Sequence, residues 1–285
     1  MKYIHLIVNV FLIILAANVA AQESSPDSIK YGWTKEMLGG LNLTQTSFDN
    51  WSQGGENTMA WQVNLNFKFI NDQEKTNWSN TGKFSYGFTK SGKDESKKSI
   101  DEIKLESVLT YKLNVYVNPF IAVSGLTQFD TGYKYTDDSK TKVSAFMDPG
   151  YIRESIGVGY EPNKIVKTRV GAALKHTITS NYPVPYADDP ETDEIEKTKT
   201  EFGAESVTDV SWQIAEDMQL TSKLELFSAF KAWDRIDVDW DTLLSVKVSK
   251  YFNVIFNVKL FYDKDISPKR QLKQSLAMGL TYSFL

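Results

Sequence analysis

The sequence predicts an all-β protein, a transmembrane antiparallel up-and-down β-barrel of about 12 strands. Three observations predict this fold. A short apolar segment opens the chain, alternating apolar and polar residues recur through the rest of it, and long and short connections alternate between the candidate strands. A closed barrel satisfies all of its backbone hydrogen bonds between strands, so strands of this kind can cross a membrane.

The start of the chain has the composition of a secretory signal peptide. Lys2 precedes an almost wholly apolar run from Leu6 to Ala16, and Asn18–Ala21 supplies small residues for cleavage. This run is too short to cross about 30 Å of hydrocarbon as a helix. The expected division is residues 1–21 as signal peptide, 22–34 as a short periplasmic leader and 35–285 as an outer-membrane β-barrel.

Composition excludes several classes of function. The chain has no cysteine, so disulfides, thiol chemistry and a lipid anchor on cysteine are excluded. Its 32 basic and 36 acidic residues give a net charge of −4, without the basic patch that a nucleic acid would require. Aromatic residues make up 13% of the chain, which is high for its size and suggests belts at a membrane interface.

Alternation of apolar and polar residues predicts the strands, because successive side chains of a strand point to opposite faces. From Met59 to Phe69 every odd position is apolar, and the even positions between them are mostly polar. Most of the later candidate strands repeat this pattern. The 12 candidate strands contain residues 41–43, 59–69, 78–88, 103–113, 116–129, 152–160, 166–174, 202–214, 220–230, 236–248, 252–262 and 272–284.

The connections between these strands alternate in length. In outer-membrane barrels the long loops face outward and the short turns face the periplasm, which predicts periplasmic termini. The expected partners are outer-membrane lipids, lipopolysaccharide and the barrel-insertion machinery, with no nucleic acid, and the oligomeric state stays open. The long connections are 49–57, 91–98, 130–150, 181–199, 231–235 and 263–270, and the short ones are 71–75, 112–114, 161–164, 216–218 and 250–251.

Aromatic residues fall at both ends of the candidate strands, where a membrane meets water. The alternative is a soluble β-sandwich or barrel in which the same apolar stripes form a core. The residues expected at the periplasmic end are Phe69, Trp78, Tyr111, Tyr160, Trp212, Phe252, Tyr282 and Phe284, and those at the other end are Trp61, Phe88, Phe230, Trp240 and Tyr262.

The run Asn50-Trp51-Ser52-Gln53-Gly54-Gly55-Glu56-Asn57 precedes the strand that starts at Met59. With this run the chain resembles a family of outer-membrane β-barrels from Bacteroidota that is catalogued only as a domain of unknown function. The resemblance implies an outer-membrane barrel and assigns no activity and no catalytic residues. Adjacent glycines permit a sharp backbone turn. The loop with Trp51, Gly54, Gly55 and Glu56 is therefore either a plug folded into the barrel or a contact for a ligand or partner.

The polar face of the candidate strands carries charges of both signs. A barrel of about 12 strands is narrow beside the 16–18 strands of open porins, so paired charges would largely fill its lumen. The expected lumen charges are Lys68, Lys83, Lys104, Glu106, Arg169, Lys175, Glu205, Asp209, Lys223, Glu225, Asp237, Asp239, Asp241 and Lys259.

Asp237, Asp239 and Asp241 share one face of a strand and could hold Ca²⁺. Same-face neighbours are nearly 7 Å apart, however, so salt bridges to lysines such as Lys223 and Lys247 are the preferred interpretation. The acidic loop is interpreted as a solvated outer loop, with divalent-bridged contact to lipopolysaccharide as the alternative. Its acidic residues are Asp188, Asp189, Glu191, Asp193, Glu194 and Glu196.

His176 is the histidine outside the signal peptide, and it shares the apolar face with Ser180. Some membrane-embedded lipid hydrolases place a histidine and a serine on the lipid-facing rim. Here no third orienting group is apparent, so a rim histidine beside lipid headgroups is the preferred interpretation.

The sequence thus favours a narrow channel or transporter for small polar solutes, without enzymatic activity, cofactor or metal. A structural or partner-binding barrel that acts through its outer loops is the alternative, and a lipid hydrolase comes third.

Overall fold

A computed structural model describes residues 31–47, 56–114, 116–136 and 139–284. The chain divides into two compact units, Met1–Tyr31 and Gly32–Leu285, and the second is described below. The expected signal peptide and the loop residues Trp51, Gly54 and Gly55 lie outside the described residues. Among the described residues, no helix is long and apolar enough to cross a membrane.

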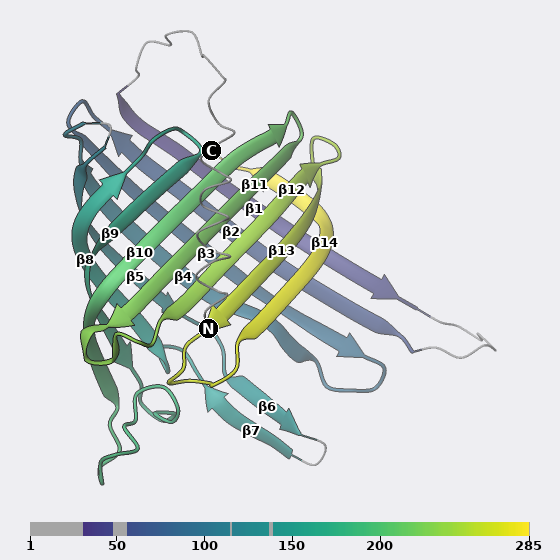
Figure 1. The fold of residues 1–285 in the computed structure, drawn as a ribbon. Coiled ribbons are helices and arrows are strands. Elements are labelled where there is room, and N and C mark those ends of the chain that lie inside the picture. The colour runs from purple at the N-terminus through teal and green to yellow at the C-terminus, as the bar shows by residue number, and fades with distance from the viewer. Residues whose placement is uncertain (1–30, 48–55, 115, 137–138, 285) are drawn as a thin grey trace. The chain divides into compact units, whose positions relative to one another are not determined.

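Within the described residues, 12 antiparallel strands close into one barrel (Figure 1). Each strand pairs with its neighbours in chain order, except that β5 pairs directly with β8, and β14 closes the barrel against β1. The barrel strands are β1 Gly32–Thr46, β2 Thr58–Asp72, β3 Thr76–Ser91, β4 Lys97–Tyr111, β5 Asn118–Thr127, β8 Gly150–Tyr160, β9 Val166–Ile178, β10 Thr198–Ala215, β11 Met218–Ala229, β12 Asp237–Lys247, β13 Phe252–Tyr262 and β14 Gln271–Ser283.

The predicted barrel class and strand number are confirmed, and each candidate strand corresponds to one barrel strand. The first strand begins at Gly32, inside the segment expected to be a leader. The long connection between β5 and β8 also contains an additional hairpin, β6 Gly132–Thr136 and β7 Ser139–Ser144, which forms a separate two-stranded sheet. This hairpin was not predicted, because its two strands are short and mostly polar and show too little apolar alternation to indicate a strand.

Most apolar side chains of the strands face outward. Ile121 is 53% exposed, Ile156 63% and Leu276 74%. By contrast, Phe227, which lies on the inward face of β11, is only 2% exposed. Exposed apolar surface on this scale is what a membrane barrel presents to lipid. The alternative of a soluble protein with these stripes in its core is therefore wrong.

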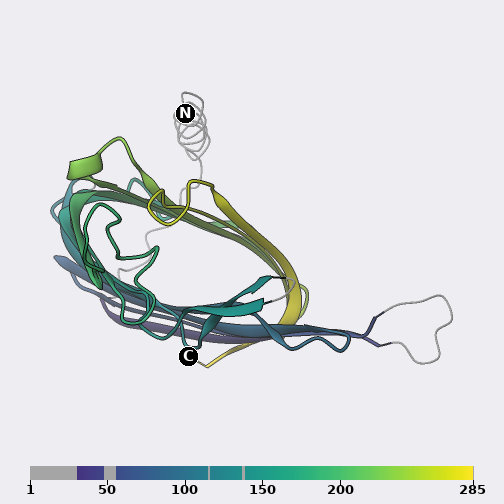
Figure 2. The same ribbon diagram turned by 90° about the horizontal axis from the view of Figure 1, so that it is seen from below.

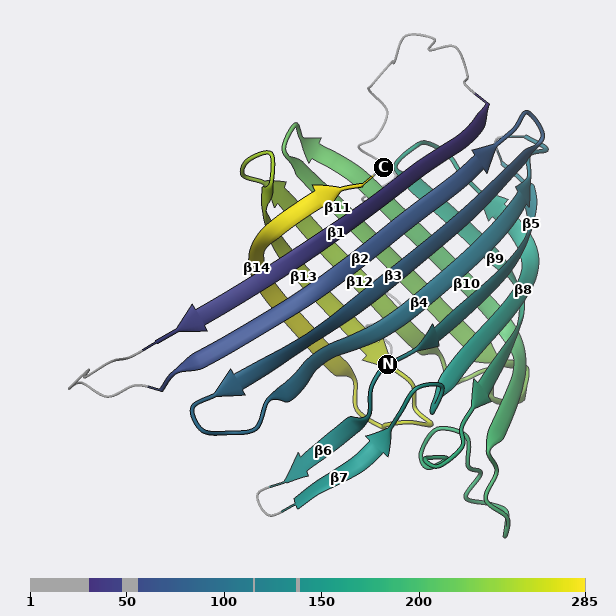
Figure 3. The same cartoon turned by 180° about the vertical axis from the view of Figure 1, so that it is seen from behind.

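Seen along its axis, the barrel is flattened (Figure 2). The wall formed by β1–β4, which faces the viewer in Figure 3, lies opposite the wall formed by β10–β13. Because the barrel is flattened, side chains from these two walls can contact each other across the lumen.

Aromatic side chains contact one another at both ends of the barrel. At the end with the short turns, the rings of Trp33 and Trp78 are 5.8 Å apart, and those of Tyr116 and Tyr160 stack at 6.3 Å. At the other end, Phe202 and Phe230 meet edge to face at 4.9 Å. These groups have the positions of the interfacial belts of membrane proteins.

One pair of glycines sets the approach of β8 and β9. Gly157 is paired with Gly171, and a Cβ atom on either residue would collide with the backbone of the other strand. Glycine is needed here because the two backbones approach too closely for any side chain.

Candidate functional site

Charged side chains from both walls fill the lumen. We call these residues the lumen network, and its carboxylates outnumber its basic groups. The acidic members are Glu102, Glu106, Glu201, Glu205, Asp209, Glu225, Asp237, Asp239, Asp241 and Asp263, and the basic members are Lys83, Lys104, Arg153, Arg169, Lys175, Lys223 and Lys259.

Several ion pairs of the network cross the lumen from β3 and β4 to β11, β12 and β13. Lys83 Nζ on β3 lies 3.1 Å from Asp241 Oδ2 on β12. Lys104 Nζ on β4 lies 2.6 Å from Glu225 Oε1 on β11, and Lys259 Nζ on β13 lies 2.9 Å from Glu102 Oε2 on β4. Side chains that meet in this way close the middle of the barrel to anything large.

Glu106 on β4 is the acceptor for two basic groups from other strands, Arg169 on β9 and Lys223 on β11. Arg153 on β8 lies 3.7 Å from Glu205 and 3.6 Å from Glu225. Because most of these carboxylates face more than one basic group, loss of one partner leaves a charge that is only partly compensated.

Lys175 forms the part of the network nearest the long loops. Its Nζ lies 2.7 Å from Asp237, 3.0 Å from Asp263 and 3.6 Å from Glu201. The Lys175 side chain is only 10% exposed. One ammonium thus holds together three carboxylates from β10, β12 and the loop after β13.

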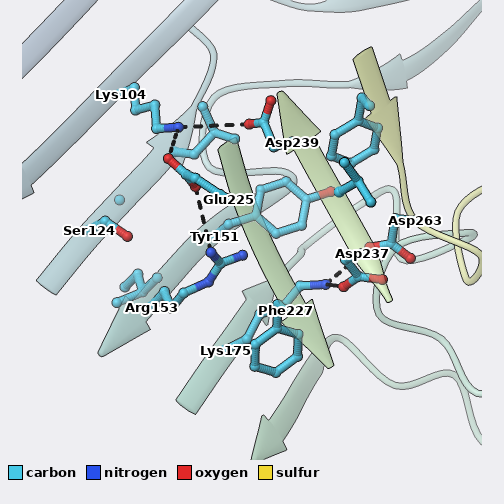
Figure 4. Close-up of a pocket in the computed structure, with 15 residues that line it drawn as sticks. Lys104, Ser124, Tyr151, Arg153, Lys175, Glu225, Phe227, Asp237, Asp239 and Asp263 are labelled. Carbon is cyan, nitrogen blue, oxygen red and sulfur yellow. Dashed lines mark hydrogen bonds and ion pairs between the residues drawn. The ribbon is translucent and has the colours of Figure 1, made fainter. Parts of the chain in front are cut away.

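A cavity of about 90 Å³ lies within the network (Figure 4). At about 30 Å³ per water molecule, it has room for a few waters or one very small solute. Its lining combines charged groups with the rings of Tyr151, Phe227 and Phe261. Phe227 lies 5.4 Å below the Arg153 guanidinium and 5.5 Å from Lys175 Nζ, which are cation–π distances.

Two buried polar atoms in the lining have no hydrogen-bond partner among the described residues, Arg153 Nε and Asp239 Oδ1. Buried polar atoms normally find a partner, which can be a water molecule. Both atoms are covered by neighbouring groups, and Asp239 Oδ1 lies 3.6 Å from Lys259 Nζ.

Most of the expected lumen charges meet in this network. Lys68 does not, and its side chain is exposed on β2. Four members of the network were not predicted, namely Glu102, Arg153, Glu201 and Asp263, and neither was the Phe227 ring inside the lumen. Strand parity could have indicated all of these except Asp263, which lies in a loop where alternation no longer applies.

The three aspartates of β12 have different partners from those expected. Asp237 pairs with Lys175, Asp241 with Lys83, and Asp239 lies 3.7 Å from Lys104 and 3.6 Å from Lys259. Lys223 binds Glu106 instead, because the flattened barrel brings β4 close to it, and Lys247 is exposed at the end of β12. Within the described residues, no group of three or more His, Asp or Glu side chains is arranged to hold a metal ion.

Among the described residues, the candidates outside the lumen lie near the long-loop end. Glu56, the described member of the predicted plug or ligand loop, accepts a 2.8 Å hydrogen bond from the Ser91 hydroxyl. His176 Nδ1 lies 3.0 Å from the Thr200 hydroxyl, whereas the backbone N–H of Ser180 donates to Asp148. The described contacts therefore do not join His176 and Ser180 into a catalytic pair.

The loop after β13 is attached to β10 and to the β11–β12 connection by Asp265. This carboxylate accepts a hydrogen bond from Lys199 and lies 3.5 Å from Arg235. Burial raises the pKa of Asp265, but the hydrogen bond from Lys199 and the two positive charges outweigh burial, so its pKa lies below the ordinary value of 3.8.

Solved structures that resemble this chain are bacterial barrels. One is the translocator domain of the autotransporter NalP from Neisseria meningitidis, with 10% identity, coverage of 98% of this chain and 95% of that chain, and a TM-score of 0.39. Another is the COG4313 outer membrane channel from Pseudomonas putida F1, with 11% identity, coverage of 92% and 99%, and a TM-score of 0.40. A third is the Ralstonia pickettii toluene transporter TbuX, with 10% identity, 90% coverage of both chains and a TM-score of 0.31. At these values the likeness carries no argument about activity.

No curated protein sequence matches the chain. The resemblance to a family without assigned function is confirmed, since the model of the family described as "Protein of unknown function (DUF3078)" matches residues 43–133, a stretch that contains the Trp51–Asn57 run.

Proposed function

We propose that this chain is an outer-membrane barrel whose lumen is a narrow pathway for small polar solutes, kept nearly closed by the lumen network. The observation that supports this most directly is the cavity of about 90 Å³ inside the network, which is lined by charged side chains and by the rings of Tyr151, Phe227 and Phe261. A polar cavity of this size has room for solutes of only a few heavy atoms.

Single-channel recording in planar bilayers tests this proposal. The wild-type barrel should show a unit conductance well below that of a 16-strand porin under the same conditions. The double variant Lys104→Ser, Glu225→Ser removes one cross-lumen pair together with its side-chain volume, so its conductance should rise severalfold.

The matched control is Lys167→Ser, Glu161→Ser, a pair whose side chains are 55% and 46% exposed near a short turn. It should leave the conductance unchanged. Absence of any conductance in the wild type and in the Lys104, Glu225 variant, with insertion verified, would refute a pathway through the lumen.

We also propose that both termini face the periplasm, because the short turns lie at the end of the barrel where the chain enters β1 and leaves β14. Single cysteines at Asp188 and Asn114 would test this orientation on intact cells. An impermeant reagent should label the cysteine at Asp188 and not the one at Asn114, and the reverse order would overturn the proposal.

The second candidate function is a barrel that binds a partner with its long loops, and the β6–β7 hairpin favours it. Tyr133 and Tyr135 lie side by side on this hairpin, and Lys140 Nζ is 4.4 Å from the Tyr133 ring. Lys140 also pairs with Glu95 of the β3–β4 loop at 2.7 Å. If the Lys104, Glu225 variant conducts no ions, this hairpin becomes the leading site.

A further inference from the structure

A carboxylate stands on the lipid-facing wall of the barrel. Glu154 is exposed on β8, on the same parity as Ile156, which is 63% exposed. Its partners across the two neighbouring strands are Val123 on β5 and Leu174 on β9, which are 47% and 37% exposed. Arg153, the preceding residue, points into the lumen cavity. The strand therefore turns the Glu154 side chain outward, away from the lumen.

Along the barrel, Glu154 is in register with Leu174 on β9, which in turn pairs with Phe202 of the aromatic group at the long-loop end. A charged group on a lipid-facing wall is costly unless another group compensates its charge. Among the described residues, no hydrogen bond or ion pair of the Glu154 carboxylate is found. A partner that compensates this charge is therefore expected from outside the chain.

The wall is hollowed at this point. A groove of about 320 Å³ runs beside Glu154, and its rim includes Ile121, Ile156, Leu174 and Phe202. Ala172, which is paired with Ile156, contributes only a methyl group to the groove. The groove is at the lower end of the sizes of small-molecule sites and is lined almost wholly by apolar side chains.

The chemistry of the groove defines its occupant. Its lining contains one acidic residue and no Lys, Arg or His. An alkyl chain matches the apolar side chains of the rim. An ammonium group on that chain would supply the charge that Glu154 lacks. We propose that the groove binds a membrane amphiphile with one alkyl chain along Ile156 and Phe202 and an ammonium group on Glu154. This site is separate from the lumen and does not depend on conduction.

Titration calorimetry of the refolded full barrel in maltoside micelles tests the proposal. The probe is dodecylammonium chloride at pH 7, where the amine is charged, and dodecanoate is the probe with the same length of chain and the opposite charge. Dodecylammonium should give saturable binding and dodecanoate should not. Because one charge-assisted contact is lost, Glu154→Gln should weaken dodecylammonium binding by about tenfold or more.

Two further variants separate the charge from the groove. Ala172→Phe keeps Glu154 but fills the groove, and it should also weaken binding. Glu216→Gln removes an exposed carboxylate in the turn between β10 and β11 and should change nothing. Heat-modifiable gel migration verifies that each variant is folded. Equal binding of dodecanoate, unchanged binding by Glu154→Gln, or no effect of a folded Ala172→Phe variant would overturn the proposal.

Discussion

Lys175 shows what a single residue of the network does. Its ammonium lies between Asp237, Asp263 and Glu201, which would repel one another without it. Lys175→Met keeps much of the apolar stem and removes the charge. Because this leaves buried carboxylates uncompensated, we expect a loss of about 3–5 kcal/mol in the free energy of unfolding, measured by urea titration in lipid vesicles.

The control for this prediction is Lys167→Met. Lys167 forms one pair with Glu161 at 2.7 Å, and its side chain is 55% exposed. An exposed pair contributes about 1 kcal/mol or less. If Lys175→Met were as mild as Lys167→Met, the network would not be a connected set of buried charges.

A change of charge should lower the free energy of unfolding by different amounts at two neighbouring residues of β11. Leu224 is on the outward parity beside Trp240, whereas Lys223 faces Glu106 in the lumen. Leu224→Arg should cost about 2–4 kcal/mol if it lies near the bilayer midplane, since the new charge must enter hydrocarbon. Lys223→Ala should cost less, because Arg169 still compensates Glu106. If Leu224→Arg left the free energy of unfolding unchanged while Lys223→Ala failed to fold, the lipid-facing and lumen-facing sides of β11 would be reversed.

At the scale of elements, the 12 barrel strands were predictable because each has one face in lipid and one in the lumen. That difference in solvent imposes apolar residues at every second position, as in Met59–Phe69. The strands of the β6–β7 hairpin are short and mostly exposed, so the alternation in Tyr133–Tyr135 is too brief to predict a strand and Lys140–Lys142 shows none. The first residues of β1 were assigned to the leader because Lys35, two positions after Trp33 and on the same face of the strand, is polar and interrupts the alternation.

The loop between β13 and β14 should respond to acid. The pKa of Asp265 is lower in the folded protein than in the unfolded chain, so its pairing with Lys199 and Arg235 stabilises the protein above about pH 4. This contribution is lost as the pH falls through the folded-state pKa, because protonation removes the charge. The urea midpoint of the wild type should exceed that of Asp265→Asn at pH 6, and the difference should shrink below about pH 4. A difference that grew toward low pH would contradict the assigned sign.

At the scale of the whole molecule, parity predicts which residues enter the lumen but not which of them meet. Lys83 and Asp241 are 158 positions apart in the chain and come together only when β14 closes on β1 and the barrel flattens. The expected partner of the β12 aspartates, Lys223, lies on the adjacent strand, yet it reaches across to Glu106. Contacts between opposite walls depend on the cross-section of the barrel, which no local pattern encodes.

A cysteine scan of β11 tests the central claim most directly, namely that alternate residues face a closed polar lumen and the lipid. The chain has no cysteine, so each residue from Met218 to Ala229 can be replaced singly without background. In proteoliposomes, a fluorophore at even-numbered positions should be quenched by brominated lipid. Probes at odd-numbered positions should be protected from the lipid quencher and react only slowly with bulky water-soluble thiol reagents, because the network obstructs access. Quenching without a period of two, or rapid labelling of the odd-numbered positions by bulky reagents, would contradict the account.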